Sequence, residues 1–337
     1  MAVNLANAFV DNKIENALVC TRTSGPLEKF MPENTKFFEL RKGSSLDLIA
    51  FIRLIRIINS MKPDIIHAHS TSIYWGIGLK LLKPRVKLIW HDHDGMSENL
   101  KDSDRRSLKW LSKKINGIVA VNEILCGWSL RNMKTVNVFF LRNFPYLKDF
   151  NHQNSRDKNI ILHLANLRPQ KDHYTLFKAI KLLRERSSVK FEVWCAGKDS
   201  QDAYSHLLKD TVREFKLDRE IKFLGGVEDT LFLLERATIG ILSSHSEGLP
   251  VSLLEYGLAA LPVVVTNVGQ CAEVVDHGKC GTVVAASNPR ELADALEWHI
   301  QNRADSINLG AKFKQHVEEN YGSQRFIEDY QKMLNGL

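Results

Sequence analysis

Cysteine is scarce in this sequence, and its few copies are scattered. The 337 residues contain five cysteines, and no two of them have the short spacing that a zinc site or a redox dithiol needs. They stand at Cys20, Cys126, Cys195, Cys271 and Cys280. We therefore expect reduced thiols buried in the core and no metal held by cysteine.

Long apolar runs are also missing. No stretch of about 18 uninterrupted apolar residues occurs, so a membrane-spanning helix is not expected. The first residues, MAVNLANAFVDNK, lack the charged-then-apolar order of a signal peptide. We expect a cytoplasmic protein.

Two ligand-binding signatures are absent as well. No Gly-x-Gly-x-x-Gly follows a strand, which disfavours a nicotinamide dehydrogenase. There is no nucleic-acid recognition motif and no basic strand interleaved with aromatics, so nucleic acid is not an expected partner.

The remaining composition is that of a globular α/β protein. Hydrophobic residues make up 44% of the chain, enough for two domain cores. Strand and helix patterns alternate in two series, the pattern of parallel sheets covered on both faces. The apolar runs predicted as strands are DIIHAH, VKLIWH, GIVAV, IILHLA, FEVWCAG, IKFLGG, TIGILSS, PVVVTN and TVVA.

A polar stretch divides the two series. Leu147 to Asn159, including DFNHQNSRDKN, is predicted as an interdomain linker. We expect a first domain over 1–150, a second over 151–318, and a closing helix over 319–337 with apolar Phe326, Ile327, Tyr330 and Leu334. In the first domain, Ser44 or Ser45 is predicted to cap a helix that Lys62 and Pro63 end.

The net charge of +7 calls for an anionic partner. One candidate surface is the segment 103–116, SDRRSLKWLSKKIN, where Leu108, Leu111 and Ile115 form a stripe and Trp110 lies among cations. Such a helix can lie on an anionic leaflet. The alternative is an ordinary sheet-covering helix with a solvated basic face.

The most informative stretch runs from Ser243 to Val275. Pro250 suits a first helical position, so a helix should open just after Glu247, with free N–H groups that favour a phosphate. Glu255 follows eight residues later, a rise of roughly 12 Å. Two carboxylates facing one groove can accept hydrogen bonds from sugar and ribose hydroxyls. The alternative is a dipole-stabilised Glu247 and a solvated Glu255.

Two cations follow an earlier buried strand. In ANLRPQKD, Arg168 and Lys171 precede a helix, and ligands of open α/β sheets bind at the carboxyl ends of the strands. We expect them to bind a diphosphate and to offset the charge that grows on the leaving group. Alternatively, both are solvated turn residues.

Taken in order, these motifs resemble those of the retaining glycosyltransferases of family 4. The resemblance is carried by SEGLP with the second glutamate, and by IIHAHS, LIWHDHDG, VAVNE, LRNFPY, LANLRPQKD, WCAGKD, IKFLGGVED and VEENYGSQRFIEDYQKML. It implies an α/β GT-B architecture of two Rossmann-like domains facing a cleft. The second domain would hold the nucleotide sugar, the first would hold the acceptor, and the last helix would return to the first.

The resemblance also implies roles for single residues. Glu247 matches the glutamate that contacts the donor sugar, Glu255 matches the one that binds ribose hydroxyls, and Arg168 and Lys171 match the diphosphate ligands. His91 matches a cleft histidine that contacts the reacting sugar or a phosphate, where a neutral imidazole could accept or relay a proton.

Backbone positions are implied in the same way. Gly248 and Leu249 would donate backbone N–H groups to the donor. Gly226 and Val227 match a loop near the nucleobase, with a plain strand-ending turn as the alternative.

Two patterns in the first domain resemble metal-binding motifs, and we interpret neither of them as a metal site. Asp92 and Asp94 form the Asp-x-Asp motif of a different glycosyltransferase fold, which we interpret as coincidence because Arg168, Lys171 and a helix end can neutralise the diphosphate. His67 and His69 lie on one face of a strand. Lacking a third ligand nearby in sequence, they favour a structural role in the cleft over metal binding.

One departure from the family pattern concerns the beginning of the chain. Members usually begin with a strand and a glycine-rich loop before a helix similar to VNLANAFVDNK, and this sequence starts inside that helix. A sheet neighbour would then be unpaired, and we expect impaired use of the acceptor.

The resemblance implies a reaction. A hexose-type sugar would move with retention from a nucleoside diphosphate to a hydroxyl of a saccharide or lipid-linked saccharide, in polysaccharide or glycolipid biosynthesis. No metal, cofactor or covalent intermediate is expected, because the departing phosphate would take the proton and no activated nucleophile is evident. A sugar-nucleotide epimerase or phosphorylase of the same architecture, or a non-catalytic binding protein, is the alternative. The phosphorylase would need a pyridoxal-binding lysine that the sequence does not show.

Overall fold

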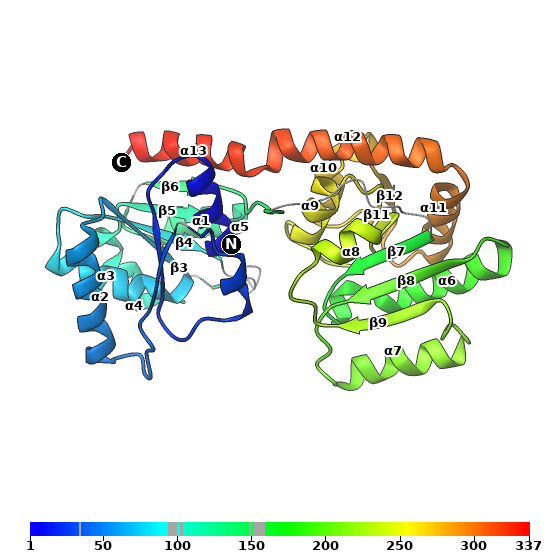
Figure 1. Ribbon diagram of the computed structural model, residues 1–337, viewed down its shortest axis with the longest axis horizontal. Coiled ribbons are helices and arrows are strands. Elements are labelled where there is room, and N and C mark those ends of the chain that lie inside the picture. The colour runs from blue at the N-terminus through cyan, green and yellow to red at the C-terminus, as the bar shows by residue number, and fades with distance from the viewer. Residues whose placement is uncertain (34, 94–99, 102–103, 136, 148–149, 151–158) are drawn as a thin grey trace. The chain divides into compact units, whose positions relative to one another are not determined.

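The computed structural model describes residues 1–337 except 34, 94–99, 102–103, 136, 148–149 and 151–158 (Figure 1). The chain forms two compact units. Unit 1 comprises Met1–Asn143 and Ser323–Leu337, and unit 2 comprises Phe144–Gly322. The predicted linker lies mostly outside the described residues.

Unit 1 contains a parallel sheet in the strand order β3-β4-β5-β6. Its strands are β3 (Ile65–His69), β4 (Lys87–Asp92), β5 (Gly117–Ala120) and β6 (Val138–Phe140). Its α-helices are α1 (Ala2–Asp11), α2 (Leu48–Met61), α3 (Ile73–Leu82), α4 (Arg106–Leu111), α5 (Glu123–Asn132) and α13 (Ser323–Asn335). β3, β4 and β5 were predicted from their apolar runs, and β6 was not predicted.

Two further short strands of unit 1 were not predicted. β1 (Ala17–Cys20) and β2 (Lys36–Glu39) pair with each other in parallel and form a sheet of their own. Within the described part of the chain, β1 and β3 each keep one edge without a hydrogen-bonded strand.

The start of α2 corrects the predicted cap. Asp47, and not Ser44 or Ser45, is the N-cap, and its carboxylate accepts a hydrogen bond from the backbone N–H of Ala50 at 2.9 Å. An acidic cap also complements the helix dipole, which a serine cannot do. The helix ends as predicted at Lys62, which adopts the left-handed conformation before Pro63.

The basic segment 103–116 is less regular than predicted. It is divided into the short helix α4 and a 3₁₀ turn, Ser112–Lys114. Leu108 and Ile115 are buried, whereas the Trp110 side chain is 72% exposed. Arg105 does not belong to a solvated basic face, because its guanidinium pairs with Asp92 at 2.5 Å and lies over the ring of Trp90.

Helix α13 packs against α1 in unit 1. Phe326, Ile327, Tyr330 and Met333 are its buried residues. Met333 therefore takes the buried place predicted for Leu334. The ring centroid of Tyr330 lies 5.5 Å from that of Phe9, so the last helix packs against the first.

Unit 2 is built on a six-stranded parallel sheet in the order β12-β11-β10-β7-β8-β9. The strands are β7 (Asn159–Leu164), β8 (Phe191–Ala196), β9 (Ile221–Gly225), β10 (Ile239–Leu242), β11 (Val263–Thr266) and β12 (Thr282–Val284). The α-helices are α6 (His173–Arg186), α7 (Ala203–Glu214), α8 (Leu231–Arg236), α9 (Val251–Leu258), α10 (Cys271–Val274), α11 (Pro289–Gln301) and α12 (Arg303–Tyr321). Figure 1 shows these elements from green to orange.

Hydrophobic cores cover both faces of this sheet. Along β7, Ile161 belongs to one core, and Ile160 and Leu162 belong to the other, because successive side chains of a strand point to opposite faces. Both faces being covered explains why the strands read as continuous apolar runs.

The strand order of unit 2 reverses next to β7. The chain moves from β7 to β8 and β9 on one side and then returns to β10 on the other. Such a switch point separates the loops that follow the two central strands and leaves a crevice between them, where α/β sheets bind ligands.

Among the described residues, no helix is both long enough and apolar enough to cross a bilayer.

Candidate functional site

The loops that follow β7 and β10 bring two predicted site residues into contact at the switch point of unit 2. The Lys171 ammonium lies 2.5 Å from Oε1 of Glu247. The Ser244 hydroxyl donates to the same oxygen at 2.7 Å. The Glu247 side chain is 7% exposed and that of Lys171 is 23% exposed, so both charges are largely withdrawn from water.

Hydrogen bonds from buried groups hold these two loops together. The Ser243 hydroxyl contacts the carbonyl oxygens of Lys171 and Asp172 at 3.0 and 3.1 Å. The backbone N–H of His245 donates to the carbonyl of Gln170 at 3.0 Å. The position of the ammonium relative to the carboxylate is therefore set by the backbone.

A glycine closes the other side of the Glu247 turn. Gly269 has a φ of +50°, and a Cβ there would lie 2.0 Å from the Glu247 carbonyl oxygen. The next residue, Gln270, donates its backbone N–H to the carbonyl of Gly248 at 3.2 Å. Only glycine permits this approach without strain.

Helix α9 starts one residue later than predicted. Pro250 is its N-cap, in an extended conformation, and the helix itself begins at Val251. Glu247 therefore lies in the turn before the helix, while Glu255 lies within it. The neighbouring Tyr256 fixes α9 to the sheet, since its hydroxyl donates to the Leu162 carbonyl at 2.9 Å and accepts from the Leu164 N–H at 2.7 Å.

Burial raises the pKa of Glu255 to about 7, because the carboxyl loses hydration without a compensating cation. At neutral pH this group is a mixture of acid and carboxylate. The predicted fully solvated alternative for Glu255 is wrong, since the residue is only partly exposed.

The other predicted residues of unit 2 lie at the same edge of the sheet. Arg168 follows β7 and is exposed, and its guanidinium has no partner among the residues the structure describes. Gly226 and Val227 are exposed in the loop after β9. Gly248 is exposed and Leu249 is half-buried, both between β10 and α9. The structure thus brings Lys171 and Glu247 into contact, places Glu255 in α9 and places the remaining predicted residues of unit 2 in neighbouring loops.

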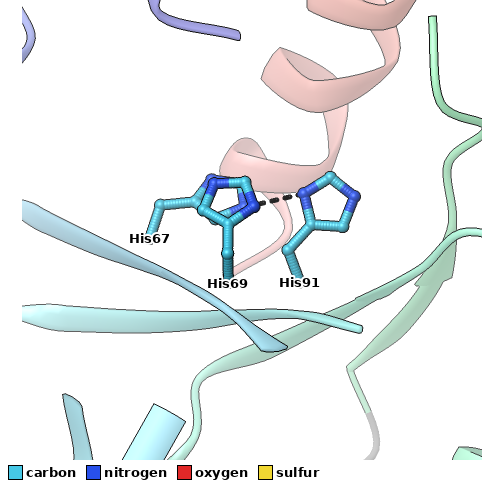
Figure 2. A group of neighbouring side chains, drawn as sticks. All are labelled: His67, His69 and His91. Carbon is cyan, nitrogen blue, oxygen red and sulfur yellow. Dashed lines mark hydrogen bonds between the residues drawn. The ribbon is translucent and has the colours of Figure 1, made fainter. Parts of the chain in front are cut away.

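Unit 1 carries a cluster of histidines at the carboxyl ends of β3 and β4. His67 Nε2 lies 3.1 Å from His91 Nδ1, and His67 Nδ1 lies 3.0 Å from the hydroxyl of Tyr330 on α13. His69 Nδ1 lies 2.9 Å from His93 Nε2. Figure 2 shows the rings of His67, His69 and His91 grouped together above the strands.

The histidines of this cluster are uncharged at neutral pH. Burial lowers the pKa of His67 to about 3 and that of His93 to about 4. The pKa values of His69 and His91 are also well below the usual value, first because of burial and then because neighbouring histidines would repel a second positive charge. His91 is completely buried, and its Nε2 has no hydrogen-bond partner within the described residues.

Three of these rings offer nitrogens within 4.8 Å of one another, His67, His69 and His91. Neutral imidazoles suit transition metals. Both nitrogens of His67 already contact neighbouring groups, however, and the three-residue set contains no carboxylate. The contacts therefore favour a hydrogen-bonded chain of side chains over a metal centre.

The Asp-x-Asp pattern does not form a free pair of carboxylates. Asp92 is 2% exposed and is neutralised by Arg105, which holds it away from a metal-binding role. Asp94 lies outside the described residues.

Sequence reasoning missed several residues of these sites. Tyr330 was assigned only a packing role, and its contact with His67 joins positions 263 residues apart. Ser243 and Ser244 looked like ordinary strand-end serines. For the two serines, a signal was present in the sequence. They are small polar residues directly after a buried strand, and such residues must find hydrogen-bond partners when they are buried.

Comparisons with known proteins show the family of this chain. Residues 147–319 match the family profile described as Glycosyl transferases group 1, and residues 1–132 match the profile described as Glycosyltransferase Family 4. The architecture and these matches define a glycosyltransferase with two Rossmann-like α/β domains, the GT-B fold. The chain belongs to the group 1, or family 4, glycosyltransferases.

Curated relatives are distant in sequence. An N,N'-diacetylbacillosaminyl-diphospho-undecaprenol α-1,3-N-acetylgalactosaminyltransferase of Campylobacter jejuni is 22% identical over 71% of this chain and 60% of its own length. An uncharacterized glycosyltransferase of Haemophilus influenzae is 20% identical over 99% of this chain and 95% of its own. The first alignment thus spans less than two thirds of that relative.

Solved structures share the fold at low identity. A glycosyltransferase from Rickettsia africae aligns over 99% of this chain and 94% of its own, with a TM-score of 0.76 and 18% identity. Anabaena HepE in complex with UDP and glucose aligns over 100% of this chain and 96% of its own, with a TM-score of 0.74 and 16% identity.

Proposed function

We propose that this glycosyltransferase moves a hexose-type sugar from a nucleoside-diphosphate donor to a hydroxyl of a saccharide or lipid-linked saccharide, with retention of configuration. The observation that carries the proposal is the Lys171–Glu247 pair at the switch point of unit 2. An ammonium for phosphate and a carboxylate for hydroxyls, held side by side, match the two halves of a sugar nucleotide.

The diphosphate would lie against Lys171 and Arg168. Lys171 is held in place by Glu247 before any donor binds, so little side-chain ordering remains to be done. Arg168 is exposed and can turn its planar fork toward phosphate oxygens. Together these cations offset the charge on the departing diphosphate, so that no metal ion is needed for that task.

Residues of two loops and of α9 would make the other contacts with the donor. Glu247 would accept hydrogen bonds from the sugar, and Glu255 would accept them from the ribose. The backbone N–H groups of Gly248 and Leu249 would serve the phosphate or sugar. Gly226 and Val227 would lie near the base.

The chemistry requires no nucleophile from the protein. The acceptor hydroxyl would attack from the side of the leaving group, and the departing phosphate would take its proton. The anomeric carbon–oxygen bond to phosphate breaks as the bond to the acceptor forms. His91 is buried in the free protein, so it would contact the reacting sugar or a phosphate oxygen only after its Nε2 becomes accessible to the donor.

The relatives support the choice of substrates. HepE was solved with UDP and glucose, and the Campylobacter relative is named for a lipid-linked diphosphate acceptor. We extend both features to this chain as part of the proposal, without naming its nucleobase, sugar or linkage.

A panel of sugar nucleotides tests the donor half of the proposal by thermal stabilisation. Binding should raise the unfolding midpoint in proportion to the logarithm of ligand concentration over Kd. Lys171→Met should remove the shift, and Glu247→Gln should reduce it. Lys279→Met is the matched control, since it also breaks a lysine–carboxylate pair of unit 2, here with Asp276 at 3.1 Å, away from the switch point. A shift that survives Lys171→Met would contradict the proposal.

Product analysis tests the reaction itself. Transfer of labelled sugar to an acceptor, with the same anomeric configuration in donor and product, is the expected result. A changed sugar without an acceptor would indicate an epimerase, and binding without turnover on any acceptor would indicate a binding protein.

The acceptor half of the proposal includes an anionic membrane surface. The exposed Trp110 lies among the exposed cations Arg106, Lys113 and Lys114, and α2 presents Leu48 and Ile49 at 74% and 66% exposure. An exposed aromatic with flanking cations suits a headgroup region. Sedimentation with vesicles containing an anionic lipid should carry the protein down, and Trp110→Ser should weaken this. Equal sedimentation with neutral vesicles would contradict it.

A further inference from the structure

Three side chains of unit 1 form a continuous hydrogen-bonded chain that ends at His91. Tyr330 of α13 contacts His67 Nδ1 at 3.0 Å, and His67 Nε2 contacts His91 Nδ1 at 3.1 Å. Tyr330 is 3% exposed and His91 is fully buried. The rings of Tyr330 and His67 are also stacked, 5.5 Å apart, which holds the hydroxyl opposite the imidazole.

Each group in this chain is neutral, which restricts how protons can be arranged. Burial lowers the pKa of His67 to about 3 and raises the pKa of Tyr330 above its usual value. A neutral imidazole has one N–H and one bare nitrogen. Once the donor at one end of this hydrogen-bonded series is chosen, the position of the hydrogen on every imidazole nitrogen along it is fixed.

Two arrangements are possible. In one, Tyr330 donates to His67 Nδ1, His67 Nε2–H donates to His91 Nδ1, and His91 carries its hydrogen on Nε2. In the other, every bond is reversed, and both the Tyr330 hydroxyl proton and the bare His91 Nε2 lack partners within the described part of the chain. The first leaves one buried polar group unsatisfied and the second leaves two, so the first costs less free energy.

We propose that Tyr330, acting through His67, holds His91 in the tautomer with its hydrogen on Nε2, so that His91 is a hydrogen-bond donor in this enzyme and not a base. The inference rests on the proposed function, in which His91 touches the donor sugar or a phosphate oxygen. It refines that function, because an Nε2–H can stabilise charge developing on such an oxygen but cannot accept the acceptor's proton. Tyr330 and His67 are then positioning residues.

The tautomer can be read without any substrate. In protein with ¹⁵N-labelled histidine, the ring nitrogen shifts and two-bond couplings distinguish a protonated nitrogen from a bare one, and His91→Asn identifies the His91 signals. The expected result is a protonated Nε2 and a bare Nδ1. A protonated Nδ1 in the wild-type protein would overturn the proposal.

Tyr330→Phe tests whether the hydroxyl sets the tautomer. The ring remains to stack on His67, but the donor at the end of the chain is lost, so we expect His91 to become a mixture of tautomers. The kcat for transfer should fall roughly 3- to 10-fold, the effect of one neutral hydrogen bond, with the KM for the donor little changed. An unchanged tautomer together with an unchanged kcat would overturn the role of Tyr330.

Tyr74→Phe is the matched control. It removes a phenolic hydroxyl of the same unit, 3.3 Å from the Ser107 hydroxyl, away from the histidine cluster, and should leave the His91 signals in place. His67→Phe is the second variant should Tyr330→Phe not fold, because it keeps an aromatic ring against Tyr330 and removes both nitrogens. It should also mix the His91 tautomers, and a pure Nε2–H form there would overturn the proposal. If the protein binds no sugar nucleotide, the proposed function fails while the nitrogen spectrum still decides the tautomer.

Discussion

Glu255 links the stability of the free protein to its proposed ligand. Its carboxyl is buried without a cation, and its pKa in the folded state is about 7, above the value of an unfolded glutamate. An acid whose pKa is raised by folding contributes stability below its unfolded pKa, and that stability is lost as pH rises through about 7.

Replacing Glu255 by Gln should therefore stabilise the free protein, and more so at higher pH. Gln keeps the shape of the side chain and removes the charge that burial disfavours. Urea unfolding of both proteins between pH 5 and 8 measures the difference, which should widen up to about pH 7 and then level off. A constant difference across this range would contradict the raised pKa.

The same carboxyl predicts how donor binding depends on pH. Only the ionised form can accept hydrogen bonds with both oxygens from ribose hydroxyls. Affinity for a sugar nucleotide should thus increase from pH 6 to pH 8 in the wild-type protein. In Glu255→Gln it should be weaker and nearly independent of pH, as measured by titration calorimetry.

At the scale of elements, the turn before α9 depends on one glycine. Gly269→Ala would place a methyl group 2.0 Å from the Glu247 carbonyl oxygen at a positive φ. We expect a loss of about 1–3 kcal/mol in the free energy of unfolding and a displaced Glu247. Gly248→Ala is the control for stability, because a Cβ there meets nothing within 4 Å. Equal unfolding midpoints for the two variants would contradict the close approach.

The elements that carry the site were largely predictable, and their contacts were only partly so. Apolar runs such as IILHLA and TIGILSS predicted β7 and β10, and parallel strands place their loops at one edge. Lys171 was expected to face a phosphate, and its pairing with Glu247 was not foreseen, because it depends on hydrogen bonds from the Ser243 hydroxyl to backbone carbonyls about 70 residues away. β1 and β2 were missed because runs of four residues carry little periodicity.

At the scale of the whole molecule, two compact units share one chain, and α13 belongs to unit 1 although α12, its neighbour in sequence, belongs to unit 2. We expect calorimetry to resolve two transitions, of which that of unit 2 moves further to higher temperature with a sugar nucleotide. Cleaving the chain after Gly322 should lower the other transition, because it removes the buried Phe326, Ile327, Tyr330 and Met333 from unit 1. A single transition that shifts as a whole would contradict this independence.

Buried imidazoles occur in both units. Among the residues that the structure describes, seven histidines have a lowered pKa, His67, His69, His91, His93, His163, His173 and His299. The unfolded chain takes up protons at these sites below about pH 6.5, while the folded chain does not. Each site then removes up to about 1.4 kcal/mol of stability per unit of falling pH. Mild acid should therefore lower the free energy of unfolding of this enzyme, so neutral buffers are the better choice for its purification and storage.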